Sequence, residues 1–306
     1  MNFTFQRLTP ENIYWLQELH KAEYGQNVSL SYLMQKYSAG HLCNRMYGYL
    51  AMYNNKAVAV TAAIPYLLQY NGIVELTAQE ADTITLQQFR GKGLFTTLSK
   101  LLHDDLVRDG FSCVWTFPSK KGEVIYHKLN WQQVSSINGY CIPVAGRYVA
   151  YTRRQINALV YGNMATQHFF KQILSAEKPV PSFAGNQYVS VCRNDGHYRY
   201  KDFGGSFCIT VNGKRIWLKQ VGSLNIGELD PLTTSEVIPL VNELKKYALK
   251  AGAQNIYFQT SACSVNDIAF SQHFEKFDSW KLGCYNFNSQ FPLDKLRVTW
   301  ADLDTF

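Results

Sequence analysis

Residues 83–108 read as a strand, a glycine-rich turn and a helix in direct succession. The strand-like run ends at Leu86, the turn at residues 90–93 reads R-G-K-G, and a helix-like run follows it. Two glycines one residue apart let a ligand approach the backbone closely, because neither carries a Cβ atom. The first turn of the helix would add unpaired N–H groups and a partial positive charge. This succession predicts an anion site suited to a pyrophosphate.

The spacing of the turn residues distinguishes this loop from other phosphate loops. It is neither the GxGxxG of dinucleotide-binding folds nor the GxxxxGK[ST] of P-loops. Gln88, Gly91 and Gly93 form a Q-x-x-G-x-G pattern, which resembles the Q/R-x-x-G-x-G/A loop of the GCN5-related N-acetyltransferases (GNAT family). The resemblance implies that the loop holds the pyrophosphate of acetyl-coenzyme A. It assigns cofactor contacts to Leu86, Gln88, Arg90, Gly91, Lys92, Gly93, Leu94 and Ser119.

The order of predicted elements in the first half resembles the same family over about residues 1–145. The resemblance implies an α/β fold in which a mixed central sheet is flanked by helices. Thr9 and Ser29 are predicted to cap the first two helices. The predicted elements are a strand at 3–8, helices at 9–24 and 29–37, strands at 47–53, 56–70 and 75–86, a helix at 94–109, a strand at 111–117, a helix at 123–129 and a strand at 133–143.

The second half repeats this order more weakly. Residues 110–119 and 252–261 each start at a glycine after a long helix and run through an apolar strand to Ser or Thr. We therefore predict a GNAT domain at 1–147, a helical connector at 148–185 and a degenerate GNAT-like domain at 186–306. A coincidence of two α/β units is the alternative. The second strand-to-helix junction lacks paired glycines and carries Glu228 and Asp230, which would repel a pyrophosphate.

Residues 126–131 read Y-H-K-L-N-W and resemble the family segment Y-x-K-L-G-F/W. The resemblance places Tyr126 where the family has the tyrosine that protonates the coenzyme A thiolate; a packed core tyrosine is the alternative. Asn130 replaces the usual glycine, and Asn tolerates a left-handed turn better than most residues. Where the family often has an Asn cofactor contact, this chain has Ser119, a weaker substitute.

Glu80 and Asp82 are the predicted general bases, with Glu80 preferred. They lie two residues apart on a strand, so we expect both on one face. An exposed or paired carboxylate is the alternative for either. His103 and His127 are further candidates for the base, although His103 lies in the middle of a predicted helix, where a surface residue is expected. In the family a backbone N–H faces the thioester carbonyl, and position assigns it to Leu86 or Thr85.

Composition excludes several other classes of protein. The net charge of +7 over 306 residues is modest and forms no basic stripe, so no nucleic acid partner is expected. The seven cysteines are widely spaced without a C-x-x-C, so no metal site is expected. With no signal-like segment and no apolar stretch long enough to span a bilayer, we expect a cytoplasmic protein without a membrane partner.

The resemblance to the GNAT family implies an acetyltransferase that moves an acetyl group from acetyl-CoA to an amine of a small acceptor, such as an amino sugar. One alternative is a tRNA-dependent aminoacyl transferase of the tandem type. Another is a non-catalytic protein that binds coenzyme A. The sequence does not indicate an oligomeric state.

Overall fold

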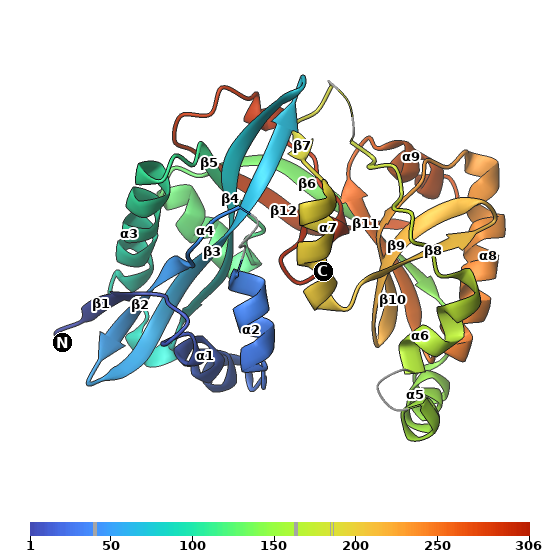
Figure 1. Ribbon diagram of the computed structural model, residues 1–306, viewed down its shortest axis with the longest axis horizontal. Coiled ribbons are helices and arrows are strands. Elements are labelled where there is room, and N and C mark those ends of the chain that lie inside the picture. Colours follow the sequence, from blue (N-terminus) through green and yellow to red (C-terminus); the bar gives the residue numbers. More distant parts are fainter. Residues whose placement is uncertain (39–41, 162–164, 184, 186) are drawn as a thin grey trace. The chain divides into compact units, whose positions relative to one another are not determined.

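Two units make up the chain in the computed structural model, which describes residues 1–38, 42–161, 165–183, 185 and 187–306 (Figure 1). Unit 1 comprises Met1–Val134, Val191–Phe203 and Leu282–Asp294. Unit 2 comprises Ser135–Ser190, Gly204–Lys281 and Lys295–Phe306. Each unit is a mixed sheet flanked by helices, which confirms the predicted α/β fold class.

Unit 1 is built on strands in the order β1-β2-β3-β4-β5-β12. Neighbouring strands are antiparallel except β4 and β5, which are parallel. The α3 helix packs on one face of β2–β4 and α1 on the other (Figure 1). The elements are β1 (Thr4–Arg7), α1 (Tyr14–Tyr24), α2 (Leu30–Tyr37), β2 (Tyr47–Tyr53), β3 (Lys56–Tyr70), β4 (Ile73–Thr85), the 3-10 turn η1 (Gln87–Phe89), α3 (Leu94–Arg108), β5 (Cys113–Thr116), α4 (Lys120–Lys128), α7 (Asp195–Lys201) and the end of β12 (Lys276–Asn286).

Local sequence explains where several of these elements begin and turn. Asn54 and Asn55 have φ of 49° and 59°, as a two-residue hairpin turn between β2 and β3 requires. The Ser29 hydroxyl accepts from Tyr32 N at 3.2 Å and so caps α2 as predicted. The prediction for Thr9 was wrong. The α-helix begins only at Tyr14, because residues 10–13 form turns and Asn12 Oδ1 accepts the Thr9 N–H.

Unit 2 has the strand order β6-β11-β10-β9-β8, with β10 and β11 parallel. Its long helix α8 begins at a capping box between Thr233 and Glu236. The elements are β6 (Gln132–Pro143), α5 (Arg147–Tyr161), α6 (Ala165–Phe170), the 3-10 turn η3 (Lys171–Ile173), β8 (Phe207–Val211), β9 (Lys214–Val221), β10 (Ser223–Leu229), α8 (Thr234–Lys250), β11 (Asn255–Ser261), α9 (Val265–Ser271) and the 3-10 turn η6 (Trp300–Asp302).

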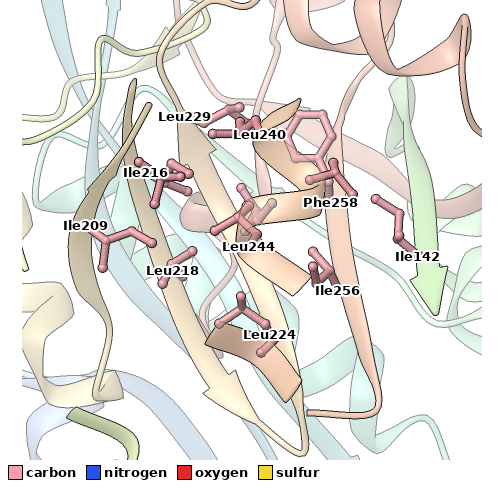
Figure 2. Packing of buried hydrophobic residues seen from close by; sticks show 14 of the residues in the cluster. Ile142, Ile209, Ile216, Leu218, Leu224, Leu229, Leu240, Leu244, Ile256 and Phe258 are labelled. Atoms are coloured by element: carbon pink, nitrogen blue, oxygen red, sulfur yellow. The ribbon is translucent and has the colours of Figure 1, made fainter. Parts of the chain in front are cut away.

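The core of unit 2 lies between α8 and the sheet. Figure 2 shows Leu240 and Leu244 of α8 over the aliphatic side chains of the strands. Every second residue of a strand faces the same side, and Ile216, Leu218 and Ile256 are fully buried there. The apolar runs of the second half thus form a core of their own.

The closing strand of each half of the sequence lies in the other unit. Residues 137–143 of β6 pair with β11 in unit 2. Residues 283–286 of β12 pair antiparallel with β5 in unit 1. Val191–Phe203, from the second half, also belongs to unit 1. Neither half of the sequence therefore contains all the strands of one unit.

We expect a chain cut after residue 147 to lose cooperative folding. Such a cut removes β12 from β5 and removes β11 from β6, which leaves unpaired strand edges that favour aggregation. Circular dichroism during heating, with the full chain as control, measures this. A monomeric, cooperatively melting fragment would show that the closing strands are dispensable.

Candidate functional site

The glycine turn lies between η1 and α3 and has the backbone that the sequence predicts. Gly91 and Gly93 have φ of 73° and 74°, a region that L side chains adopt only with strain. A Cβ atom built on either glycine would meet no other atom within 4 Å. The two glycines are therefore required by backbone conformation, and the space above them is open.

No side chain occupies the backbone N–H groups in the first turn of α3. Its N-cap is Gly93, no side chain caps it, and it contains no acidic residue. The first N–H groups of a helix have no intrahelical acceptor, and the helix dipole adds positive potential there. Gln88 and Lys92 are exposed beside this turn. The Leu94 side chain is buried in the core, so only its backbone could reach a ligand. The geometry suits an anion.

Two predicted cofactor residues are engaged within the protein. The Arg90 guanidinium pairs with Glu23 of α1, and its Nε donates to the Thr85 carbonyl at 3.1 Å. Arg90 thus ties the loop to α1 and is not a free phosphate ligand. The Ser119 hydroxyl accepts from Gly122 N at 3.2 Å and caps α4. The Ser119 hydroxyl is therefore engaged in capping α4.

The β4 strand continues beyond Gln79, past the residues that pair with β5. The parallel register of the two strands includes Ala78 with Val114 and Gln79 with Trp115, whereas β4 continues to Thr85. Leu86 N donates to the Val58 carbonyl at 3.0 Å, so its amide is occupied by β3. Backbone groups alternate in direction along an antiparallel pair. The Thr85 amide therefore faces away from β3 and is the better placed of the two predicted donors.

A β-bulge in β4 separates the two predicted bases. Thr61 pairs with Thr83 and Ala63 pairs with Glu80, so Ala81 and Asp82 together oppose a single residue of β3. Such a bulge interrupts the alternation of side chains. The prediction that Glu80 and Asp82 share a face was wrong for this reason.

Asp82 lies on the side of α1 and α2, in a paired cluster. Its carboxylate accepts from Lys36 Nζ at 2.9 Å and from the Tyr37 hydroxyl at 2.6 Å, and His20 Nε2 lies 3.3 Å away. Burial opposes ionisation of Asp82, but the charge of Lys36 and the hydrogen bonds from His20 and Tyr37 hold its pKa well below the usual range. Asp82 is a structural anion and is not available as a base.

Glu80 lies on the side of α3 and α4, and its side chain is fully buried. Its Oε1 accepts from the Tyr126 hydroxyl at 2.7 Å and from the Thr83 hydroxyl at 3.2 Å. Its Oε2 lies 3.6 Å from His103 Nε2. The structure therefore brings together Glu80 and Tyr126, which sequence reasoning had assigned to separate roles.

Burial, the charge of Glu80 and the hydrogen bond to Glu80 raise the pKa of Tyr126 well above the tyrosine range. The Tyr126 ring lies edge-on to Phe95 and Trp131, with ring centroids 5.3 and 4.9 Å away. The phenol is consequently a protonated donor at neutral pH.

His103, one of the further candidates for the base, lies beside Glu80. We expected a surface residue, but its ring lies 5.2–5.8 Å from the rings of Trp131, Tyr285 and Phe287. Tyr285 and Phe287 reach it from the far end of the chain, next to β5. Asn130 has φ of 61°, which confirms the predicted left-handed turn after α4.

The corresponding junction of unit 2 is filled by its own chain. The Glu228 carboxylate accepts from the Ser182 hydroxyl at 2.6 Å, and Asp230 accepts from Val180 N at 2.8 Å. Arg215 also pairs with Asp230, at 2.9 Å. The two carboxylates thus hold the connector segment against the sheet.

Neither a metal cluster nor a membrane span is present in the described part of the chain. No group of three or more His, Cys, Asp and Glu side chains there could hold a metal ion. No described helix is long and apolar enough to cross a bilayer.

We predict that Asp82→Asn destabilises the protein by roughly 3 kcal/mol at neutral pH, because it removes the carboxylate whose charge balances that of the buried Lys36 ammonium. A lowered pKa stabilises the fold above the unfolded-state pKa of ~3.9, and this stabilisation is lost as the pH falls through the folded-state value. The difference between wild type and variant should therefore shrink below about pH 4.

Urea unfolding from acidic to neutral pH measures this difference. Asp104→Asn, at an exposed position of α3, is the control and should change stability by less than about 0.5 kcal/mol. A pH-independent difference for Asp82→Asn would contradict the assigned ion pair.

Comparison with known proteins agrees with this geometry. Residues 4–134 match the family model described as acetyltransferase (GNAT) domain. No curated protein sequence matches the chain significantly. The whole chain resembles a conserved protein of unknown function from Enterococcus faecalis, a probable N-acyltransferase, with a TM-score of 0.62 and 11% identity over 94% of this chain and 73% of that one.

Two further solved structures share the fold with similar TM-scores. A GCN5-related N-acetyltransferase from Kribbella flavida has a TM-score of 0.57 and 10% identity, over 96% of this chain and 72% of that one. The N-myristoyltransferase of Saccharomyces cerevisiae, solved with myristoyl-CoA, has a TM-score of 0.59 and 10% identity, over 94% and 79%. Residues 4–134, which contain the glycine turn and the bulged strand, thus match an acetyltransferase domain of the GNAT family.

Proposed function

We propose that this protein transfers an acetyl group from acetyl-CoA to an amine of a small acceptor, for which an amino sugar is one expectation. The observation that carries the proposal is the turn at Gly91 and Gly93, whose left-handed glycines open onto the uncapped N-terminus of α3. A pyrophosphate bound there would accept from the backbone N–H groups of the turn and the first helical turn. No side-chain cation is needed for this contact, which agrees with the pairing of Arg90 to Glu23.

In the proposed reaction the free edge of β4 orients the thioester. The Thr85 amide, which faces away from β3, would donate to the thioester carbonyl. A preorganised donor of this kind contributes a few kcal/mol where charge develops on an oxygen. Leu86 supports it indirectly, because its amide fixes this end of β4 to Val58.

Glu80 and Tyr126 would act as one coupled acid–base pair. Glu80 takes a proton from the acceptor ammonium, directly or through one water molecule. Once Glu80 is neutral, the charge and the accepted hydrogen bond that raise the pKa of Tyr126 are lost. Tyr126 then becomes a stronger acid at the stage when the coenzyme A thiolate departs and needs a proton. The 2.7 Å hydrogen bond between the two groups therefore sets the order of proton transfer.

We further propose that unit 2 is a divergent copy of this fold that does not bind the cosubstrate. In both units, three antiparallel strands precede a long helix and a strand parallel to the third (β2–β4, α3 and β5; β8–β10, α8 and β11). The connector held by Glu228 and Asp230 occupies the junction in unit 2, which leaves cosubstrate binding to unit 1.

Gly91→Glu should abolish acetyl-CoA binding without unfolding the chain, because it adds strain and a negative charge where the pyrophosphate lies. Gly72→Glu is the matched control: Gly72 also has positive φ, 78°, and open space around its Cβ position, but it lies in the β3–β4 hairpin turn. Calorimetric titration with acetyl-CoA, with ATP and phosphate as competitors, compares the two variants.

Equal affinity of the two variants for acetyl-CoA would contradict the assignment of the glycine turn as the pyrophosphate site. Binding of acetyl-CoA without transfer to any amine in a broad acceptor screen would instead support the non-catalytic alternative. Affinity for charged tRNA without affinity for acetyl-CoA would support the aminoacyl-transferase alternative.

Glu80→Gln and Tyr126→Phe should each lower kcat by about 10²-fold or more and leave acetyl-CoA affinity nearly unchanged. The double variant should cost little more than either single variant, because groups that act as a unit are not additive. The matched control is Tyr140→Phe, which removes a similar 2.7 Å hydrogen bond to a carboxylate, that of Asp267, in unit 2. Steady-state kinetics in which the two losses multiply would argue against a coupled pair.

A further inference from the structure

The α5 helix of unit 2 is attached to its unit by its polar side. Arg154 Nη1 donates to the Gly222 carbonyl at 2.9 Å, and Asn157 Nδ2 donates to the Lys250 carbonyl at 3.0 Å. A Cβ atom on Gly252 would lie 2.8 Å from Arg154 Cγ and 3.1 Å from the Ala150 carbonyl oxygen. The α5 backbone therefore lies directly on a glycine turn, and Ala150, Arg154 and Asn157 make up its inner face.

The apolar residues of α5 lie on its outer side. A surface helix normally buries its apolar stripe against the core and exposes its polar side, so α5 is inverted. Residues four and eight apart lie close to one line along a helix, which aligns Tyr148 with Ile156. The exposed large apolar side chains of α5 are Tyr148 at 87%, Val149 at 50%, Tyr151 at 56%, Ile156 at 53%, Leu159 at 86% and Val160 at 64%. Several of them line a shallow depression with Thr152 and Arg153.

The charged residues of α5 have one sign. Arg147 and Arg153 are exposed on the helix, Lys250 is exposed at the residue whose carbonyl accepts from Asn157, and residues 147–161 include no Asp or Glu. A two-fold pairing of α5 with a second copy would centre near Arg153, midway between Tyr148 and Leu159. Two arginines would then meet without a carboxylate between them, which is unfavourable. An anionic partner is favoured over self-association.

We propose that α5 lies in the headgroup region of an anionic phospholipid surface. Its apolar side chains would enter the boundary of the acyl chains while Arg147, Arg153 and Lys250 meet lipid phosphates and carboxylates. Tyrosine, with an apolar ring and a polar hydroxyl, suits the interface. This departs from our sequence-based expectation of no membrane partner, which considered only spanning segments. The proposal does not depend on the acetyltransferase reaction.

The test is co-sedimentation of the full chain with vesicles of phosphatidylcholine alone and with about 40% phosphatidylserine. We expect binding to the phosphatidylserine vesicles at least about tenfold tighter than to the neutral ones, and weaker at higher salt. Ile156→Glu should reduce binding about tenfold or more. The matched control is Ile268→Glu on α9 of the same unit, where the exposure is 56% against 53% for Ile156; this variant should bind like the wild type.

Three results would overturn the proposal. The first is no sedimentation with phosphatidylserine vesicles by a wild-type chain that melts cooperatively. The second is an equal loss in both variants. The third is a dimer, seen by light scattering, that Ile156→Glu dissociates, which would assign this surface to a second copy of the chain.

Discussion

The bulge at Ala81 and Asp82 is the constraint on which the arrangement of unit 1 depends. It shifts the alternation of side chains within one strand, so two carboxylates only two residues apart enter different environments. Asp82 receives a lysine, a tyrosine and a histidine from α1 and α2. Glu80 receives a tyrosine and a histidine from α4 and α3. Without the extra residue, both acids would compete for the same side of the sheet.

These environments also give the two carboxylates different roles. The lysine beside Asp82 compensates the burial of its charge, so this anion fastens helices to the sheet. Glu80 has no lysine or arginine among its described contacts, and its main partner is the Tyr126 hydroxyl. A buried carboxylate held by hydrogen bonds responds strongly to proton transfer, because each charge state changes the acidity of its neighbour. This property supports the coupled pair that we propose.

Each half of the sequence gives its closing strand to the unit that the other half mainly forms. β12 supplies Tyr285 to the ring cluster around His103, so a residue near the end of the chain completes the surroundings of Glu80. The second half therefore contributes to the candidate site of the first even though its own junction is filled by the connector. At the other end of unit 2, α5 is held by Arg154 and Asn157 and turns its apolar side outward.

The sequence by itself determined the features that rest on local chemistry. Asn130 adopts the left-handed backbone predicted from its residue type, and Gly91 and Gly93 form the predicted turn. The helix cap at Ser29 and the hairpin at Asn54 follow from side-chain and turn preferences. Only the tertiary structure decided the bulge, the pairing of Glu80 with Tyr126 and the exchange of closing strands. These depend on register and on contacts between residues far apart in the chain, which no local preference encodes. Their spacing along a strand suggested that Glu80 and Asp82 share a face. One extra residue in the ladder places the two side chains on opposite faces.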